Sequence, residues 1–233
     1  MLEVNAVNSF YGQAHILHEV TMAIGEGQVV ALLGRNGAGK STTLKTIMQL
    51  VRARSGTITF RDTDITHAHP HKVCKLGLGY VPEDRRIFTD LTVLENLEVG
   101  RQPPRQGMPE WTLDGLFEIF PNLYERRNRL GKEMSGGEQQ MLTIARTLMG
   151  NPRLVLLDEP SEGLAPVIVE QMANTIQSLT SHGLTIFLSE QNLHFAKLVA
   201  GRAYILEKGE VRFDGTIAEL EANPEIRDAY LSV

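Results

Sequence analysis

The chain has 233 residues, a hydrophobic content of 42% and a formal net charge of −5 at pH 7. This length supports one large domain with its own core, and the acidic balance argues against nucleic-acid binding, which requires a basic face. A single cysteine, Cys74, excludes an internal disulfide, and we expect it to be a small buried residue.

Strands and helices alternate along the first part of the chain. We expect no signal peptide at the N-terminus, and no apolar run approaches the roughly 18 residues that span a bilayer. Hydrophobic patterns predict strands at 2–7, 16–24, 29–33, 56–60 and 78–81, with a helix from 40 to about 50. The short apolar runs at 29–33 and 154–157 are typical of buried strands in a mostly parallel sheet.

The middle of the chain has a different pattern. Residues 92–99 and 113–120 have helical periodicity, so we expect a helical lobe at about 84–133, inserted into a core of about 1–83 and 134–233. Beyond the lobe we predict a helix at 135–149, a strand at 154–157, a helix at 166–179, a strand at 184–188, a helix from about 193, and a hairpin of 203–206 with 210–213. Strands that alternate with helices predict a single α/β domain over 1–233.

Residues 34–41 (GRNGAGKS) match the phosphate-binding pattern G-x-x-x-x-G-K-[ST] between a predicted strand and a predicted helix. Backbone N–H groups of such a loop, together with the helix N-terminus, surround nucleotide phosphates. We expect Lys40 to reach the β- and γ-phosphates and the Ser41 hydroxyl to ligate Mg²⁺. The predicted nucleotide contacts are Gly34, Arg35, Asn36, Gly37, Ala38, Gly39, Lys40, Ser41 and Thr42. The alternative is a glycine-rich turn that Lys-Ser follows by chance.

Two carboxylates, Asp158 and Glu159, directly follow the apolar run 154–157. Open α/β sheets bind ligands at the carboxyl ends of their strands, which places this pair at the phosphate loop. We expect Asp158 to hold Mg²⁺ through water and Glu159 to act as general base on the attacking water. The alternative is two solvated carboxylates after a strand.

The segment 134–139 (MSGGEQ) lies shortly before these carboxylates. At the start of a helix, Ser135, Gly136 and Gly137 offer a hydroxyl and unobstructed N–H groups to a γ-phosphate. We expect the carboxylate of Glu138 to point away from it. By itself, Ser-Gly-Gly is only a helix cap, but its place shortly before an Asp-Glu pair in a phosphate-loop protein makes it a stronger signal.

These motifs, in this order, resemble those of the ATP-binding subunit of ABC transporters, from Tyr11 to the C-terminus. The resemblance implies a P-loop NTPase core with an antiparallel β subdomain and an inserted α-helical subdomain, and it implies ATP and Mg²⁺ as ligands. It also implies that Tyr11 and Ile16 contact adenine and that residues 135–138 cap the nucleotide of an opposing subunit. For Tyr11, an exposed tyrosine in a turn is the alternative.

Two residues depart from the general family pattern. Glu83 stands where the family usually has glutamine, and its carboxylate can still ligate Mg²⁺. Gln191 stands at the position of the family's switch histidine and is expected to act in catalysis. A glutamine amide can hydrogen-bond a γ-phosphate or a water but carries no positive charge. Either hydrolysis is slower or the role needs only a hydrogen bond.

The segments 82–88, 91–97, 135–142 and 190–192 are similar to those of one subgroup, the second ATPase of branched-chain amino acid importers, with urea and amide importers as relatives. That resemblance implies a cytoplasmic subunit, peripheral on the inner face of the membrane. It also implies a second ATPase subunit (a copy or a sister chain), integral-membrane permease subunits and, indirectly, a periplasmic binding protein. The alternatives are a non-transport ABC ATPase and an ATP-dependent regulatory or dimerisation module.

Two further clusters are weaker signals. The alternating histidines of 67–71 suggest metal ligands on a strand, but Pro70 interrupts that strand and we expect an exposed loop. Arg85, Arg86 and the stretch 88–96 are candidates for contact with the permease, because the resemblance places them in the inserted lobe.

Overall fold

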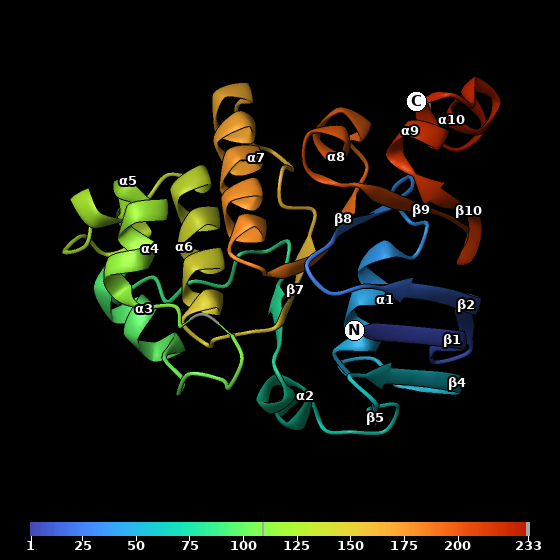
Figure 1. Ribbon diagram of the computed structural model, residues 1–233, viewed down its shortest axis with the longest axis horizontal. Helices are drawn as coiled ribbons and strands as arrows, with labels where there is room; N and C mark the ends of the chain where they lie inside the picture. The colour runs from blue at the N-terminus through green and yellow to red at the C-terminus, as the bar shows by residue number, and fades with distance from the viewer. Residues whose placement is uncertain (109, 232–233) are drawn as a thin grey trace.

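Two β-sheets lie on either side of one buried helix (Figure 1). The computed structural model describes residues 1–108 and 110–231. Helix α1 (Lys40–Ile47) contacts strands of both sheets, and all three elements share one hydrophobic core. The four-stranded sheet is antiparallel, in the order β2 (Ala14–Ile24), β1 (Leu2–Tyr11), β4 (Ala53–Phe60), β5 (Thr63–Asp64).

The six-stranded sheet carries the predicted motifs at one edge. Its order is β10 (Glu210–Thr216), β9 (Arg202–Glu207), β3 (Val29–Leu33), β8 (Thr185–Glu190), β7 (Leu154–Asp158), β6 (Leu78–Val81). Strand β10 is antiparallel to β9, and the other pairings are parallel. Because parallel strands point the same way, the carboxyl ends of β3, β8, β7 and β6 meet at one edge. There the chain continues into Gly34, Gln191, Glu159 and Glu83.

Strand β3 is buried on both faces. All five of its residues are buried, with Val30 and Leu32 in the core around α1 and Ala31 and Leu33 in the core on the opposite face. This division follows the two-residue alternation of a strand. Helices α6 (Gly136–Leu148), α7 (Pro166–Ser181) and α8 (Leu193–Val199) form the layer on that opposite face. The phosphate loop therefore leaves a strand that is packed from both sides.

The helices of the middle segment lie to one side of the molecule, next to α6 (Figure 1). They are α3 (Val93–Gly100), α4 (Leu113–Ile119), α5 (Pro121–Glu125) and the short 3₁₀ helix η1 (Gly131–Glu133). Helices α3 and α4 begin where predicted because Thr92 and Thr112 cap them with their side chains. Helix α5 was not predicted, since five residues are too few to show a helical period.

Two expectations about residues 67–76 are wrong in part or in full. Pro70, expected to lie in a loop, is the first residue of α2 (Pro70–Leu76), a position that suits its fixed backbone. Cys74, expected to be buried, is exposed. Val73 takes the inward position of α2, and the next residue is rotated by about 100° around the helix.

Two C-terminal helices, α9 (Ile217–Glu221) and α10 (Pro224–Tyr230), were also not predicted. Side-chain caps at Thr216 and Asn223 start them, and their apolar residues pack against the core on the helical face of the larger sheet. None of the helices in residues 1–108 and 110–231 combines the length and apolar character needed to cross a bilayer.

Candidate functional site

The phosphate loop turns tightly between β3 and α1, where two of its glycines approach other parts of the chain. A Cβ on Gly34 would lie 2.3 Å from the carbonyl oxygen of Leu206 in β9. Gly39 caps α1 in a left-handed conformation with a φ of 107°. A Cβ on Gly39 would lie 3.0 Å from the side chain of Leu17. Larger residues at either position would displace the loop, which accounts for the glycine spacing of the motif.

Lys40 is directed into the loop that it follows. Its side chain is 3% exposed and its ammonium group lies 3.0 Å from a carboxylate oxygen of Glu159. The ammonium group also donates to the carbonyl oxygens of Gly34 at 2.9 Å and Arg35 at 3.2 Å. These three contacts match the three donors of a lysine ammonium group. A nucleotide must therefore replace a contact that the protein already makes.

Glu159 is held in an uncommon backbone conformation. Its φ is 47°, in the left-handed region that non-glycine residues adopt uncommonly. Its N–H lies 3.1 Å from both the carbonyl oxygen and the hydroxyl of Ser189. The amide nitrogen of Gln191 donates to the Glu159 carboxylate at 3.1 Å. The structure thus brings together Lys40, Glu159 and Gln191, which follow three different parallel strands, β3, β7 and β8.

The carboxyl groups of Glu162 and Glu159 have pKa values that are shifted in opposite directions. The hydrogen bond to Glu159, followed by desolvation and nearby negative charges, raises the pKa of Glu162 to about 7. Burial opposes ionisation of Glu159, but hydrogen bonds from Glu162 and Lys40, and the charge of Lys40, lower its pKa. Glu162 therefore takes up a proton before Glu159 as the pH falls.

Asp158 is 1% exposed, and each of its carboxylate oxygens accepts a hydrogen bond. The Ser189 hydroxyl donates to one carboxylate oxygen at 2.7 Å, and the Tyr80 hydroxyl lies 3.0 Å from the other. Burial, followed by the charge of Asp158, raises the pKa of Tyr80, so this hydroxyl stays a donor. These bonds fix the Asp158 carboxylate at the end of β7.

A cavity of about 470 Å³ brings the predicted nucleotide contacts together. Its lining residues are Tyr11, Ile16, Asn36, Gly37, Gly39, Lys40, Ser41, Thr42, Glu83, Glu159 and Glu162. Tyr11 is 50% exposed, which leaves its ring accessible to a nucleotide base. Among the described residues, the predicted contacts Gly34, Arg35 and Ala38 lie outside this lining, as do Asp158 and Gln191.

The predicted metal ligands are only partly brought together. Ser41 and Glu83 line the cavity, whereas both oxygens of Asp158 accept protein hydrogen bonds. Hydroxyl and carboxylate oxygens are ligands that Mg²⁺ accepts, and this ion usually keeps waters and substrate phosphates as its other ligands. Within residues 1–108 and 110–231, no group of three or more His, Cys, Asp or Glu is arranged to hold a metal ion. The donor set fits an ion bound mainly through a nucleotide.

The residues 135–138 lie outside this cavity, at the N-terminus of α6. The Ser135 hydroxyl accepts from the N–H of Glu138 at 3.4 Å, and the Glu138 carboxylate accepts from the N–H of Ser135 at 2.8 Å. The other carboxylate oxygen of Glu138 pairs with Arg126. Glu138 is thus bound to the helix start and to Arg126, the residue after α5, while the N–H groups of Gly136 and Gly137 have no intrahelical acceptor.

Glu190 connects the end of β8 to the loop after Glu159. It is 1% exposed, and its carboxylate accepts from the N–H groups of Ser161 at 3.0 Å and Asn192 at 3.4 Å. Burial raises the pKa of Glu190. This buried carboxyl group holds the 161–166 loop against the segment that carries Gln191.

For four residues of the site, the sequence predicted no individual role: Tyr80, Ser189, Glu162 and Glu190. Glu162 and Glu190 lie next to predicted motifs, so their charge was a usable signal. Tyr80 contacts Asp158 because β6 pairs with β7, and Ser189 faces Asp158 because β7 pairs with β8. No local pattern reveals such strand neighbours.

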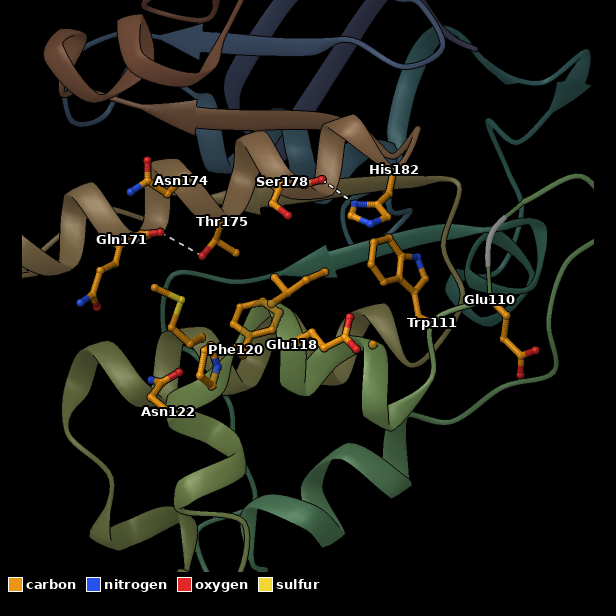
Figure 2. A pocket seen from close by; sticks show the side chains of 14 residues that line it. Glu110, Trp111, Glu118, Phe120, Asn122, Gln171, Asn174, Thr175, Ser178 and His182 are labelled. Atoms are coloured by element: carbon orange, nitrogen blue, oxygen red, sulfur yellow. Dashed lines mark hydrogen bonds between the residues drawn. The ribbon is translucent and has the colours of Figure 1, made fainter.

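A larger cavity of about 730 Å³ lies between the helical lobe and α7. Figure 2 shows Trp111 and Phe120 of the lobe opposite Thr175, Ser178 and His182. Trp111 is 6% exposed, and its ring centroid lies 5.9 Å from that of His182. Of the residues described, no predicted site residue lines this cavity. It marks the boundary between the lobe and the core.

Comparisons with known proteins agree with the fold and the motif order. The family described as ABC transporter matches residues 17–162. The chain is 43% identical to the high-affinity branched-chain amino acid transport ATP-binding protein BraG of Pseudomonas aeruginosa, covering 99% of each chain. It is 34% identical to the lipopolysaccharide export system ATP-binding protein LptB of Haemophilus influenzae, covering 95% of this chain and 92% of the relative.

Solved structures of ABC transporter ATP-binding proteins are also similar to this chain. The crystal structure of the ADP conformation of an ATP-binding cassette of an ABC transporter has a TM-score of 0.83 and 25% identity, covering 98% of this chain and 97% of that chain. The structure of an ATP-binding subunit of an ABC transporter has a TM-score of 0.82 and 29% identity, covering 99% and 96%.

Proposed function

Because the chain belongs to the ABC transporter family, as an ATP-hydrolysing subunit, we propose that it drives uptake of branched-chain amino acids through separate permease subunits. The observation that carries this proposal is the 43% identity to a branched-chain amino acid transport ATP-binding protein over 99% of both chains. A probable branched-chain amino acid transport protein of Archaeoglobus fulgidus, LivF, is 36% identical over 94% of both chains. The lipopolysaccharide export relative is less similar, at 34%.

In the proposed reaction, Lys40 and the loop N–H groups hold the β- and γ-phosphates, with Tyr11 and Ile16 beside the adenine. Glu159 accepts a proton from the attacking water as its contact with Lys40 is replaced. Gln191, already hydrogen-bonded to Glu159, orients that water. Mg²⁺, held by Ser41, Glu83 and Asp158 directly or through water, would neutralise phosphate charge.

A second ATPase subunit would complete each nucleotide site. The Ser135 hydroxyl and the N–H groups of Gly136 and Gly137 present a helix start to the γ-phosphate held by the opposing subunit. A nucleotide that contacts both subunits only when they close favours the closed state by that difference in contacts. We propose that the opposing subunit is either a copy of this chain or a sister ATPase.

The permease contact is assigned to the groove beside the segment 85–96. This groove of about 580 Å³ is lined by, among others, Phe88 and Arg146, and Phe88 is 48% exposed. An exposed aromatic side chain in a groove suits a protein partner. From α6, Thr143 donates to the Arg85 carbonyl at 2.7 Å and Arg146 to the Arg86 carbonyl at 2.6 Å. The helix that begins after Ser135 therefore also holds this segment.

The remaining assignments follow from a role in import. We propose that residues of about 84–133 act as a helical subdomain that moves against the core. The chain would lie in the cytoplasm on the inner face of the membrane, and a periplasmic binding protein would deliver substrate to the permease. These assignments are supported by similarity to transport subunits rather than by any contact in this chain.

Uptake of labelled leucine tests the proposal directly. In cells that lack this chain, the wild-type chain should restore uptake, whereas Glu159→Gln should not. Restored lipopolysaccharide export without leucine uptake would overturn the substrate assignment. Hydrolysis that Glu159→Gln abolishes would exclude a module that binds ATP only to dimerise or regulate. Full leucine uptake in cells that lack the chain would contradict the proposed role in leucine import and favour a non-transport ATPase.

A further inference from the structure

The guanidinium group of Arg85 lies over the start of α6. A Cβ on Gly136 would lie 2.7 Å from one terminal guanidinium nitrogen of Arg85 and 3.5 Å from the other. Within residues 1–108 and 110–231, the Arg85 side chain makes no hydrogen bond or ion pair. The two neighbouring arginines differ in this respect, since Arg86 pairs with Asp84 at 2.8 Å and Arg126 pairs with Glu138.

The backbone fixes this position. Arg85 and Arg86 both have left-handed φ angles, of 61° and 48°, and form a tight turn after Glu83. The turn is fastened to α6 because Thr143 donates to the Arg85 carbonyl at 2.7 Å. Arg85 itself is half-buried. Its guanidinium group therefore reaches the helix start from an anchored turn and not as a freely solvated side chain.

The charges at the start of α6 favour the binding of an anion there. A helix N-terminus carries a partial positive charge and favours anions, so a cation placed there is unfavourable. The capping carboxylate of Glu138 is already shared between the Ser135 N–H and Arg126. Arg85 thus adds a second positive charge beside Gly136 with no negative group committed to it. A phosphate that bound both the helix start and the guanidinium group would remove this cost.

We infer that Arg85 binds the γ-phosphate of the ATP held by the opposing subunit, beside Ser135 and Gly137. This inference rests on the proposed two-subunit site and adds to it a charged group that the serine-glycine motif lacks. It also separates Arg85 from the permease contact expected from sequence, which then falls to Arg86 and Phe88. Arg85 is a binding residue for the opposing nucleotide and not for the chain's own.

The test uses ATP-dependent association in a Glu159→Gln background, in which ATP is not consumed. Arg85→Ala should leave Mg-ATP binding by the isolated chain unchanged and weaken ATP-dependent association about tenfold or more, the range expected for a lost charge-assisted hydrogen bond. Arg85→Lys should recover part of the association, because it restores the charge without the planar fork. Thermal unfolding of each variant shows whether the fold is intact.

Pairs of subunits with only one complete nucleotide site show whether Arg85 acts on its own chain's nucleotide or on the partner's. A Lys40→Ala chain cannot hold its own nucleotide, and a Ser135→Arg chain cannot cap its partner's, so mixing them leaves one complete site. Arg85→Ala should weaken this pair when placed on the Lys40→Ala chain and have no effect on the Ser135→Arg chain. Equal effects on both chains, or none on either, would overturn the role of Arg85.

The outcome also separates this inference from the proposed function. If the chain does not associate with itself, the sister ATPase replaces the Ser135→Arg copy. Association that depends on ATP but not on Arg85 would contradict the Arg85 inference alone. Failure of the Glu159→Gln chain to associate with either partner in Mg-ATP would contradict the two-subunit site itself, and the Arg85 inference with it.

Discussion

The ammonium group of Lys40 and the carboxylate of Glu159 form a buried ion pair, 3.0 Å apart, in the cavity where nucleotide phosphates are expected. The residue proposed to hold the phosphates and the residue proposed to activate water are therefore in direct contact. Entry of a phosphate between them exchanges one anionic partner of Lys40 for another and releases Glu159 toward the attacking water.

Glu159→Gln should separate binding from hydrolysis. We expect ATP turnover to fall about 100-fold or more, the lower range for loss of a general base. Mg-ATP affinity of the isolated chain should not fall, because Lys40 no longer has to leave a charged partner. Turnover by phosphate release and affinity by nucleotide titration check both parts. Glu170→Gln, an exposed position on α7, is the control, and turnover retained by Glu159→Gln would exclude it as the base.

Glu162→Gln should change how stability depends on pH in the absence of nucleotide. The pKa of Glu162 is raised from 4.5 to about 7, so the folded chain binds more protons than the unfolded chain between these values. Its contribution to stability is therefore complete below pH 4.5 and is lost as pH rises through about 7. Urea unfolding at several pH values should show wild type losing stability relative to the variant across this window. A constant difference between the two proteins would contradict the raised pKa of Glu162.

Asn96→Ala should destabilise the segment assigned to the permease contact. Asn96 is fully buried, and its side chain accepts from the Phe88 N–H and donates to the Phe88 and Thr92 carbonyls, each at 2.9 Å. Loss of these bonds should cost about 2–4 kcal/mol of unfolding free energy. Asn174→Ala, exposed on α7, should cost about 0.5 kcal/mol or less. Equal costs in denaturant unfolding would refute this account of the segment.

Gly209→Ala should disturb the adenine side of the cavity. Gly209 donates to the Ala38 carbonyl of the phosphate loop at 2.8 Å and accepts from the N–H of His18 at 2.9 Å. A Cβ at Gly209 would lie 1.9 Å from the Ile16 carbonyl oxygen. We expect a loss of about 2 kcal/mol or more in stability and weaker nucleotide binding.

Gly12→Ala is the matched control for that substitution. Gly12 also has a left-handed φ, of 60°, but its Cβ would meet nothing within 4 Å. It should therefore cost about 1 kcal/mol from the backbone conformation alone. If the two variants unfold alike and bind nucleotide alike, the close approach to Ile16 does not matter.

Much of the site could be predicted from sequence because its parts follow buried strands. The apolar run before Gly34 and the run before Asp158 each end in polar residues, and parallel strands bring such ends to one edge. Strands β3 and β6 have the predicted bounds of 29–33 and 78–81. The phosphate loop, the carboxylate pair and Gln191 lie at this edge as expected.

The ion pair and hydrogen bonds between side chains of the site could not be predicted in the same way. The Lys40–Glu159 pair and the Tyr80–Asp158 bond join residues more than seventy positions apart, and their partners depend on strand order. The inward or outward position of Cys74 depends on a helix with one buried residue, Val73. Such short elements have too few apolar positions to reveal their period.

Helix α6 has a consequence for how signals cross the pair of subunits. Its first turn carries Ser135, which faces the opposing subunit's nucleotide in the proposed pair, and its flank holds the Arg86 carbonyl through Arg146. Because one helix makes both contacts, a displacement of Ser135 would move the Arg86 carbonyl with it. Each permease half would then follow the nucleotide bound by the ATPase on the other side, a crossed arrangement in which one empty site silences the opposite half.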